Sequence, residues 1–170
     1  KKVFLVARWS YYTDGDYDGI SFSHISKFEN FYSNQQNSRQ TFEFGLKKTL
    51  EMYNNIGVKI IFIHQFPMQL FLPKNIYVKA IKKDKLNYQK YLYNLSVDYE
   101  KHLSLQKFVS NTVNSIQKSL MFDQIRFDNF FCDKQKCLVG TEEGSFYSDD
   151  DHLSIYGSLR LKDNIKKLLE

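Results

Sequence analysis

Two nearly continuous apolar runs constrain the fold more than any other feature of the sequence. Residues 3–7 and residues 58–64 contain β-branched side chains without polar alternation, which is typical of strands buried on both faces. Between them, apolar residues recur at helical spacing: Phe42, Leu46, Leu50 and Tyr53. Polar residues and a glycine at 54–57 are expected to end this helix. A strand, a helix and a second strand joined by a short turn predict parallel pairing with a right-handed crossover.

The remaining sequence predicts a long loop, two further helices, a short strand and a hairpin. Residues 11–40 are polar and aromatic, and a loop of this length in a compact domain is usually functional. Ser104 is the predicted N-cap of a helix with one apolar face. Residues 124–128 predict a short strand, and residues 138–147 predict a hairpin. The chain closes with a predicted amphipathic helix whose inward face contains Leu159, Leu161, Ile165, Leu168 and Leu169.

Composition and charge exclude several classes of protein. The 170 residues, 42% of them hydrophobic, are enough for one domain with a sizeable core. The net charge of +5 is spread along the chain without a recognition motif, so no nucleic-acid partner is expected. No apolar run reaches the roughly 18 residues of a membrane-spanning helix. The sequence begins within a strand pattern and shows no signal peptide, so we expect an excised domain or a fragment.

Residues 146–157 carry the clearest chemistry in the sequence. Asp149 precedes His152 by three positions, and a loop with this spacing can fold back until the carboxylate binds one imidazole nitrogen. The other nitrogen can then take a proton from a serine hydroxyl, as in Ser-His-Asp catalysis. Because short motifs also occur by chance, the alternative is an acidic loop that caps the last helix. Asp150 and Asp151 are expected to face solvent or to cap that helix.

This stretch resembles the last sequence block of the SGNH hydrolase/acyltransferase family. The resemblance is greatest to the SGNH domains fused behind the integral-membrane acyltransferases that decorate bacterial surface glycans. Their block, roughly Tyr-x-Asp-x-x-His-Leu-Ser-x-x-Gly, is matched in register by Tyr147, Asp149, His152, Leu153, Ser154 and Gly157. Residues 3–9 and the cysteine pair upstream of the block also agree with the family. The resemblance therefore touches both ends of the chain.

The resemblance implies a fold, an activity and a location. The fold would be a three-layer α/β/α, flavodoxin-like SGNH domain over residues 1–170 that lacks its first strand or strands and belongs to a larger protein. The activity would be O-acyl transfer, with acetyl expected, to a surface glycan, with His152 as the base and Asp149 orienting it. The implied partners are a glycan acceptor, an acyl donor and an upstream transmembrane domain of the same polypeptide. The implied location is extracytoplasmic, on the periplasmic or cell-surface face, and no cofactor or metal is expected.

The serine nucleophile of the family has no counterpart in these residues. Family members carry it in a Gly-Asp-Ser block, whereas the nearest string here, residues 15–17, ends in tyrosine. Three explanations remain open: a serine upstream in a longer chain, a degenerate relative without catalysis, or Ser10 as a replacement. The presence of both Asp149 and His152 favours the upstream serine. The chain alone is therefore expected to be inactive.

Two other functions remain open. The same residues would serve a secreted carbohydrate esterase, which differs from a transferase in its acceptor. A non-catalytic glycan-binding or scaffold domain would instead stack sugars on aromatic residues of the long loop: Tyr11, Tyr12, Tyr17 and Phe22. The identities of the sugar and of the acyl donor, and the oligomeric state, are left open.

Arg8, Trp9 and Ser10 follow the first predicted strand, at the sheet edge where α/β proteins place their sites. The family's Gly-x-Asn-Asp block, whose asparagine binds the oxyanion, is absent there. Arg8 or a backbone N–H could donate to an oxyanion instead. Alternatively, Arg8 and Trp9 form a structural cation–π pair at the rim. Nothing near His24 or His64 in the sequence suggests a metal site.

Cys132 and Cys137 lack the further cysteines and histidines that a zinc site needs. They are either two unrelated buried thiols or a disulfide that closes a small loop. The resemblance points to an extracytoplasmic domain, where a disulfide persists. We therefore expect Cys132 and Cys137 to be bonded to each other.

Overall fold

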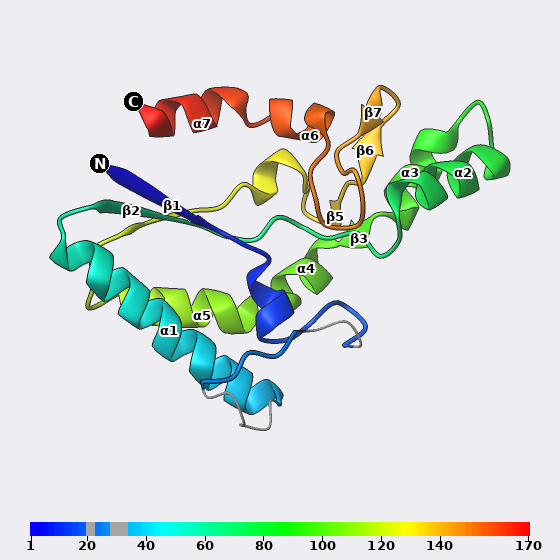
Figure 1. Ribbon diagram of the computed structural model, residues 1–170. Coiled ribbons are helices and arrows are strands. Elements are labelled where there is room, and N and C mark those ends of the chain that lie inside the picture. The colour runs from blue at the N-terminus through cyan, green and yellow to red at the C-terminus, as the bar shows by residue number, and fades with distance from the viewer. Residues whose placement is uncertain (20–22, 28–33) are drawn as a thin grey trace. The chain divides into compact units, whose positions relative to one another are not determined.

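The computed structural model describes residues 1–19, 23–27 and 34–170. Contacts divide this part of the chain into two compact units. The first contains Lys1–Gln65 and Leu103–Arg126, and the second contains Phe66–His102 and Phe127–Glu170 (Figure 1). The chain passes between the units at three places, so neither unit is one continuous segment. Among the described residues, no helix combines the length and the apolar character that a membrane crossing requires.

The first unit is built on a three-stranded parallel sheet in the order β1-β2-β4. β1 spans Lys2–Val6, β2 spans Lys59–Ile63 and β4 spans Asp123–Ile125. β2 is central, and all of its residues except the first are buried. β1 lies at the edge of the described sheet, and Val6 at its end is 54% exposed. The α/β class with parallel pairing, predicted from the two apolar runs, is confirmed.

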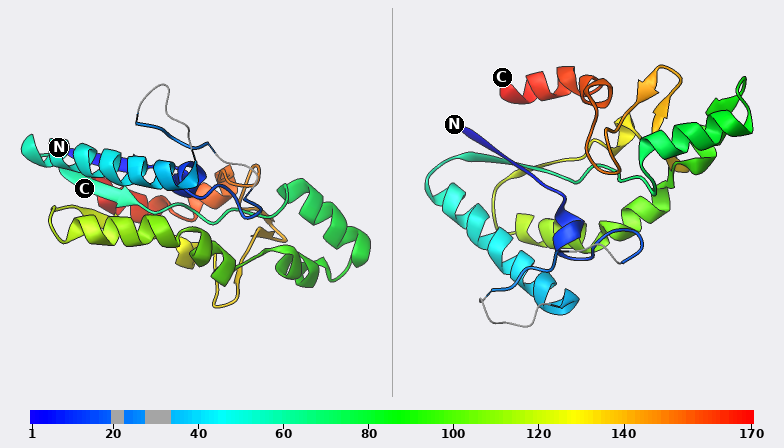
Figure 2. Two further views of the ribbon diagram at one scale, coloured as in Figure 1. Left: turned by 90° about the horizontal axis from the view of Figure 1, so that it is seen from below. Right: turned by 45° about the vertical axis from the view of Figure 1, so that its right-hand side comes forward.

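Two helices cover one face of this sheet. α1 (Gln35–Asn55) connects β1 to β2, and α5 (Lys107–Gln117) lies beside it on the same face (Figures 1 and 2). Burial of apolar side chains from both helices and from β2 forms the core, which is the main source of stability for such a layer. The ring of Trp9 stacks on that of Phe62 with the centroids 4.7 Å apart. The buried core residues are Phe42, Leu46, Leu50, Ile60, Phe62, Val109, Val113, Ile116 and Phe122.

α1 begins earlier than the sequence predicted, so the expectation of a loop up to residue 40 is wrong at its C-terminal end. Asn34 caps the helix, and its side chain accepts a hydrogen bond from the backbone N–H of Asn37 at 2.9 Å. Ser38 is buried and its hydroxyl accepts from the backbone N–H of Ile25 at 2.9 Å. Polar contacts therefore stabilise the first turn of α1. Because this turn has no apolar residues at helical spacing, the sequence pattern did not indicate it. A short 3-10 helix, η1 (Trp9–Tyr12), precedes it.

The second unit contains small elements and two short antiparallel strand pairs. Its helices are α2 (Pro73–Lys83), α3 (Tyr88–Leu95), the 3-10 helix η2 (Asp128–Phe130), α6 (Ile155–Leu159) and α7 (Lys162–Leu169). Its strands are β3 (Val97–Asp98), β5 (Lys136–Cys137), β6 (Gly140–Thr141) and β7 (Gly144–Ser145). β3 pairs with β5, and β6 pairs with β7. α4 (Tyr99–Leu105) crosses the boundary between the units.

Two predictions for the helices are wrong in detail. Ser104 lies inside α4, and the N-cap of α5 is Gln106, which makes no side-chain cap hydrogen bond. The predicted closing helix is two helices, α6 and α7, because the chain bends at Leu161, the N-cap of α7. Leu161 is 1% exposed, whereas Leu159 is 59% and Leu169 is 64% exposed. The bend therefore buries Leu161 and leaves most of the predicted inward face uncovered by described residues.

The expected disulfide between Cys132 and Cys137 is present. It closes a loop in which the carboxylate of Asp133 accepts hydrogen bonds from the backbone N–H groups of Gln135 and Lys136, each at 2.7 Å. These backbone bonds lower the pKa of Asp133, outweighing the small effect of burial. The loop leads directly into β5, so the disulfide fixes one end of the β3–β5 pair.

Removal of this disulfide should destabilise the protein moderately. Cys132→Ala is expected to lower the free energy of unfolding by about 2 kcal/mol, because the loop is short and the entropic effect grows with loop length. Urea unfolding monitored by circular dichroism measures the difference, and wild-type protein in reductant should match the variant. An unchanged urea midpoint in both samples would show that the bond does not contribute to stability.

Candidate active site

The loop between β7 and α6 presents the Asp149–His152 pair. Its two ends are joined by an isolated bridge between Tyr147 and Leu153, and the backbone N–H of Ser148 donates to the carbonyl of His152 at 2.8 Å. Tyr147 is 1% exposed and packs against the ring of Phe131 with the centroids 6.1 Å apart. The loop is thus a tight turn whose first residue, Tyr147, is anchored by buried aromatic packing.

The carboxylate of Asp149 organises this turn. Its Oδ1 accepts the backbone N–H of His152 at 2.7 Å and that of Asp151 at 3.0 Å. The imidazole Nδ1 of His152 lies 2.9 Å from Oδ2 and 3.1 Å from Oδ1. A neutral imidazole whose Nδ1–H donates to the carboxylate has its lone pair on Nε2. The pair therefore has the hydrogen-bonding arrangement that Ser-His-Asp catalysis needs from its acid and its base.

The protonation state of Asp149 suits this role. Burial alone would raise its pKa. The hydrogen bonds from the backbone N–H groups of His152 and Asp151 and from the imidazole outweigh this effect and lower the pKa to about 2. Asp149 is consequently ionised throughout the neutral range. The side chain of His152 is 75% exposed, so its ring is accessible to a substrate or to another protein segment.

Asp151 adds a second carboxylate beside the imidazole. Its Oδ1 lies 3.1 Å from Nδ1 of His152. Potential ligand atoms of Asp149, Asp151 and His152 lie within 4.8 Å of one another, which makes this the group of described residues best able to chelate a cation. Exposed acidic groups are common without a metal. The backbone and imidazole hydrogen bonds of Asp149 account for the arrangement without an ion.

The Leu-Ser-x-x-Gly part of the block fixes α6 behind the loop. Ser154 caps α6, because its hydroxyl accepts the backbone N–H of Gly157 at 3.0 Å and donates to the carbonyl of Ser145 at 2.6 Å. A Cβ atom at Gly157 would lie 2.0 Å from the carbonyl oxygen of Phe146. These residues are therefore needed for close packing of α6 on the hairpin rather than for chemistry.

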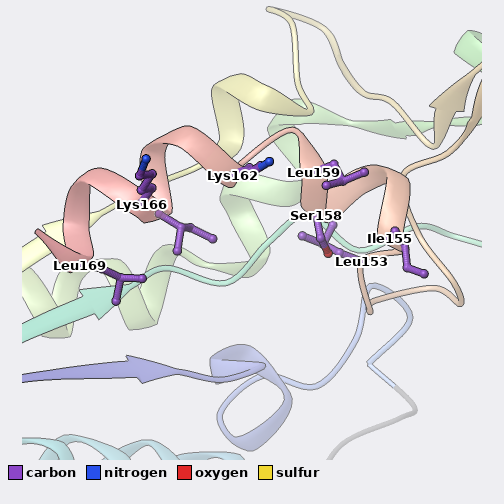
Figure 3. Close-up of a pocket in the computed structure, with 8 residues that line it drawn as sticks. Leu153, Ile155, Ser158, Leu159, Lys162, Lys166 and Leu169 are labelled. Carbon is purple, nitrogen blue, oxygen red and sulfur yellow. The ribbon is translucent and has the colours of Figure 1, made fainter.

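An apolar pocket of about 560 Å³ begins at Leu153, the residue after His152 (Figure 3). Ile155, Leu159, Ile165 and Leu169 form much of its wall. Lys162 and Lys166 also line it. The uncovered face of α6 and α7 thus forms an apolar hollow whose lining includes the residue that follows His152 in the sequence.

Arg8, Trp9 and Ser10 lie in the first unit, at the C-terminal end of β1. The indole N–H of Trp9 donates to the carbonyl of Ile63 at 2.8 Å, and the partly buried ring packs against the core. Ser10 is 0% exposed, and its hydroxyl donates to Oε1 of Gln65 at 2.8 Å. The guanidinium of Arg8 lies 4.6 Å from the ring centroid of Tyr11, so its described cation–π partner is Tyr11 and not Trp9. Burial of Ser10 argues against its use as a nucleophile.

The structure contains a second Asp–His pair, Asp128 and His102, that the sequence did not indicate. Nε2 of His102 lies 3.3 Å from Oδ1 of Asp128, and the two side chains are 1% and 7% exposed. The residues are 26 positions apart, so no local motif marks them. Because solvent does not reach this pair, it joins α4 to η2 within the second unit rather than acting on a substrate.

Three comparisons place the chain among known proteins. A family model described as "SGNH domain (fused to AT3 domains)" matches residues 1–167. Among solved structures, the periplasmic domain of the lipopolysaccharide acetyltransferase of Salmonella ser. Paratyphi A is similar, with a TM-score of 0.59 and 19% identity. The match covers 85% of this chain and 54% of that chain, so this chain spans about half the length of its structural neighbour. No curated protein sequence matches. The structural likeness shows a shared SGNH-like fold, which agrees with the fold expected from the sequence.

The lowered pKa of Asp149 predicts a dependence of stability on pH. Because the folded state favours the ionised carboxylate, this contribution is complete above the ordinary pKa of 3.8 and is lost as the pH falls through about 2. Asp149→Asn should therefore flatten the decline in unfolding free energy between these two values. Urea unfolding at a series of pH values measures it. Asp150→Asn, which changes the neighbouring carboxylate, is the control and should keep the wild-type slope. Equal slopes for wild type and Asp149→Asn would contradict the assignment.

Proposed function

Because the chain belongs to the family of SGNH domains fused to AT3 domains, we propose that it supplies the aspartate and histidine of a Ser-His-Asp triad in an O-acyltransferase. The 2.9 Å hydrogen bond between Asp149 and Nδ1 of His152 carries the proposal. An ionised Asp149 orients the ring and stabilises the imidazolium that forms during catalysis.

The reaction proceeds in two steps. A serine hydroxyl attacks the acyl carbon of the donor while His152 takes its proton, and the new imidazolium gives that proton to the leaving group as the donor bond breaks. A sugar hydroxyl then attacks the acyl-serine while His152 takes the hydroxyl proton. The serine leaves and is reprotonated by His152. An acyl group, with acetyl expected, is thereby transferred to a surface glycan.

The nucleophile is proposed to lie upstream of Lys1, in the same polypeptide. β1 has the sequence of a strand buried on both faces, yet it lies at the edge of the described sheet. The apolar face of α6 and α7 is also uncovered by described residues, with Ile155 82% exposed. A further segment of a longer chain would cover such surfaces. Residues 1–170 would then be part of one SGNH-like domain. The segments of the two compact units alternate along the chain, which agrees with this proposal.

The partners and the location follow from the family. The proposed partners are an acyl donor, a glycan acceptor and a transmembrane acyltransferase domain in the same polypeptide. The domain would lie on the periplasmic or cell-surface face of the membrane. The disulfide between Cys132 and Cys137 supports this location, because such bonds persist outside the cytoplasm.

A non-catalytic glycan-binding role is the second candidate, and the missing serine is the observation that favours it. Tyr11 and Tyr12 meet edge to face with their centroids 5.7 Å apart, and Tyr12 is 38% exposed. Phe22, the fourth aromatic residue of the predicted platform, lies outside the described residues. A carbohydrate esterase would use the same Asp149–His152 pair as the transferase and differs only in its acceptor.

The 170-residue chain alone should not hydrolyse p-nitrophenyl acetate above the rate of buffer. The reason is that the sequence contains no Gly-Asp-Ser block, which carries the nucleophile in the family, and that Ser10 is buried. Release of p-nitrophenol measures the activity. Robust turnover that Ser10→Ala abolishes would overturn both the upstream nucleophile and the structural role of buried Ser10.

In the longer protein, Asp149→Asn should reduce acyl transfer by about 10⁴-fold, because the amide favours the wrong imidazole tautomer and removes the counter-charge. Transfer of labelled acetyl to glycan measures the rate, and circular dichroism confirms that the fold is intact. Asp150→Asn is the matched control and should stay near the wild-type rate. Near-wild-type transfer by Asp149→Asn would reduce Asp149 to a residue that shapes the turn.

A further inference from the structure

Gln69 lies against the β3–β5 strand pair of the second unit. It lies in the segment between β2 and α2 and is 2% exposed. Its Nε2 donates to the carbonyl of Cys137 at 3.0 Å, and its Oε1 accepts the backbone N–H of Val97 at 3.4 Å. Val97 and Cys137 are register partners in the β3–β5 pair. The carboxamide thus contacts one buried residue of each strand.

The backbone of Gln69 contacts the Asp149–His152 turn. Its N–H donates to the carbonyl of Asp150 at 2.6 Å. Asp150 lies in the middle of the turn, directly after the carboxylate that binds the imidazole. The hydrogen bonds of the Asp149 carboxylate described above are made within the turn itself, to His152 and Asp151. The bond from Gln69 therefore joins the exposed turn to the buried β3–β5 pair.

We propose that Gln69 is a positioning residue of the candidate active site, because its carboxamide fixes its backbone on β3 and β5 and its N–H fixes the Asp150 carbonyl. The side chains of His152 and Asp149 are 75% and 42% exposed, so packing alone does not orient them. Catalytic groups need such support from neighbouring residues to remain within about 0.5 Å of a productive geometry. The effect of Gln69 on catalysis rests on the proposed function, whereas its effect on the geometry of the turn does not.

The disulfide is connected to the same group of contacts around Gln69. The carbonyl that accepts from the Gln69 side chain belongs to Cys137, which is bonded to Cys132. The covalent loop, the β3–β5 pair and the turn are thus connected through one buried carboxamide. No sequence pattern indicated Gln69, because a single glutamine in an apolar and proline-containing segment has no periodicity or motif.

The first test is made on the 170-residue chain and needs no activity. Gln69→Met keeps the length and apolar packing of the side chain but removes both of its hydrogen bonds. We expect the carboxylate of Asp149 to titrate higher, from about 2 toward 3.8, because Asp151 and His152 no longer present their N–H groups to it in a fixed turn. NMR titration of the ¹³C-labelled carboxyl measures the shift. The charged groups that face Asp149, the side chains of Asp151 and His152, are unchanged.

Gln106→Met is the matched control. Gln106 is also 2% exposed, and its Nε2 donates to the carbonyl of Gln65 at 2.7 Å in the first unit. Its replacement removes a comparable buried hydrogen bond and should leave the Asp149 titration unchanged. If Gln69→Met does not fold, Gln69→Leu also removes both side-chain hydrogen bonds without adding a titratable group, and it should shift the titration in the same direction. A folded Gln69 variant with a wild-type Asp149 titration overturns the proposal.

The second test separates this proposal from the proposed function. In the longer protein, Gln69→Met should lower kcat by about 100-fold, the cost of a misplacement near 1 Å, with little change in KM for the acyl donor. Gln106→Met should keep kcat. A shifted titration with unchanged kcat supports the positioning role and contradicts catalysis by Asp149 and His152. An unchanged titration with reduced kcat contradicts the positioning role alone.

Discussion

The candidate site depends on one carboxylate. Asp149 accepts two backbone N–H groups of its own turn and contacts Nδ1 of His152, so the same group shapes the loop and orients the imidazole. An exposed ion pair would usually contribute little and would leave the ring mobile. Here the backbone bonds hold the pKa of Asp149 near 2, so the charge beside the imidazole persists across the neutral range. The imidazole is therefore held beside an ionised carboxylate even though most of its surface is exposed.

Local patterns in the sequence predicted the elements with strong periodicity. The apolar runs of β1 and β2 and the helical spacing of Phe42, Leu46 and Leu50 predicted the parallel α/β layer correctly, because side chains of all three segments lie in one apolar core or pack against it. The start of α1 was missed, since Asn34 and Ser38 stabilise it through polar bonds. The bend at Leu161 was missed as well, because the apolar residues predicted to form one helix face continue across it.

In the candidate site, too, contacts between residues close in sequence could be predicted, whereas contacts between distant residues could not. Asp149 and His152 are three residues apart, so a motif could predict their contact. Gln69 is far from the loop in sequence, and the buried pair of His102 and Asp128 is separated by 26 residues. Contacts of this kind arise from tertiary packing and have no local signal. Trp9 and Ser10 lie at the carboxyl edge of a strand, which suggested a rim, and in the structure the indole of Trp9 and the hydroxyl of Ser10 bind groups of the first unit.

The account requires that His152 activate a serine outside residues 1–170. The most direct measurement is labelling of the longer protein with a fluorophosphonate, followed by mass spectrometry to find the modified residue. The account predicts a single labelled serine upstream of Lys1 and loss of labelling in His152→Ala. Labelling of Ser10 or of any other serine within residues 1–170, or labelling that persists without His152, would contradict it.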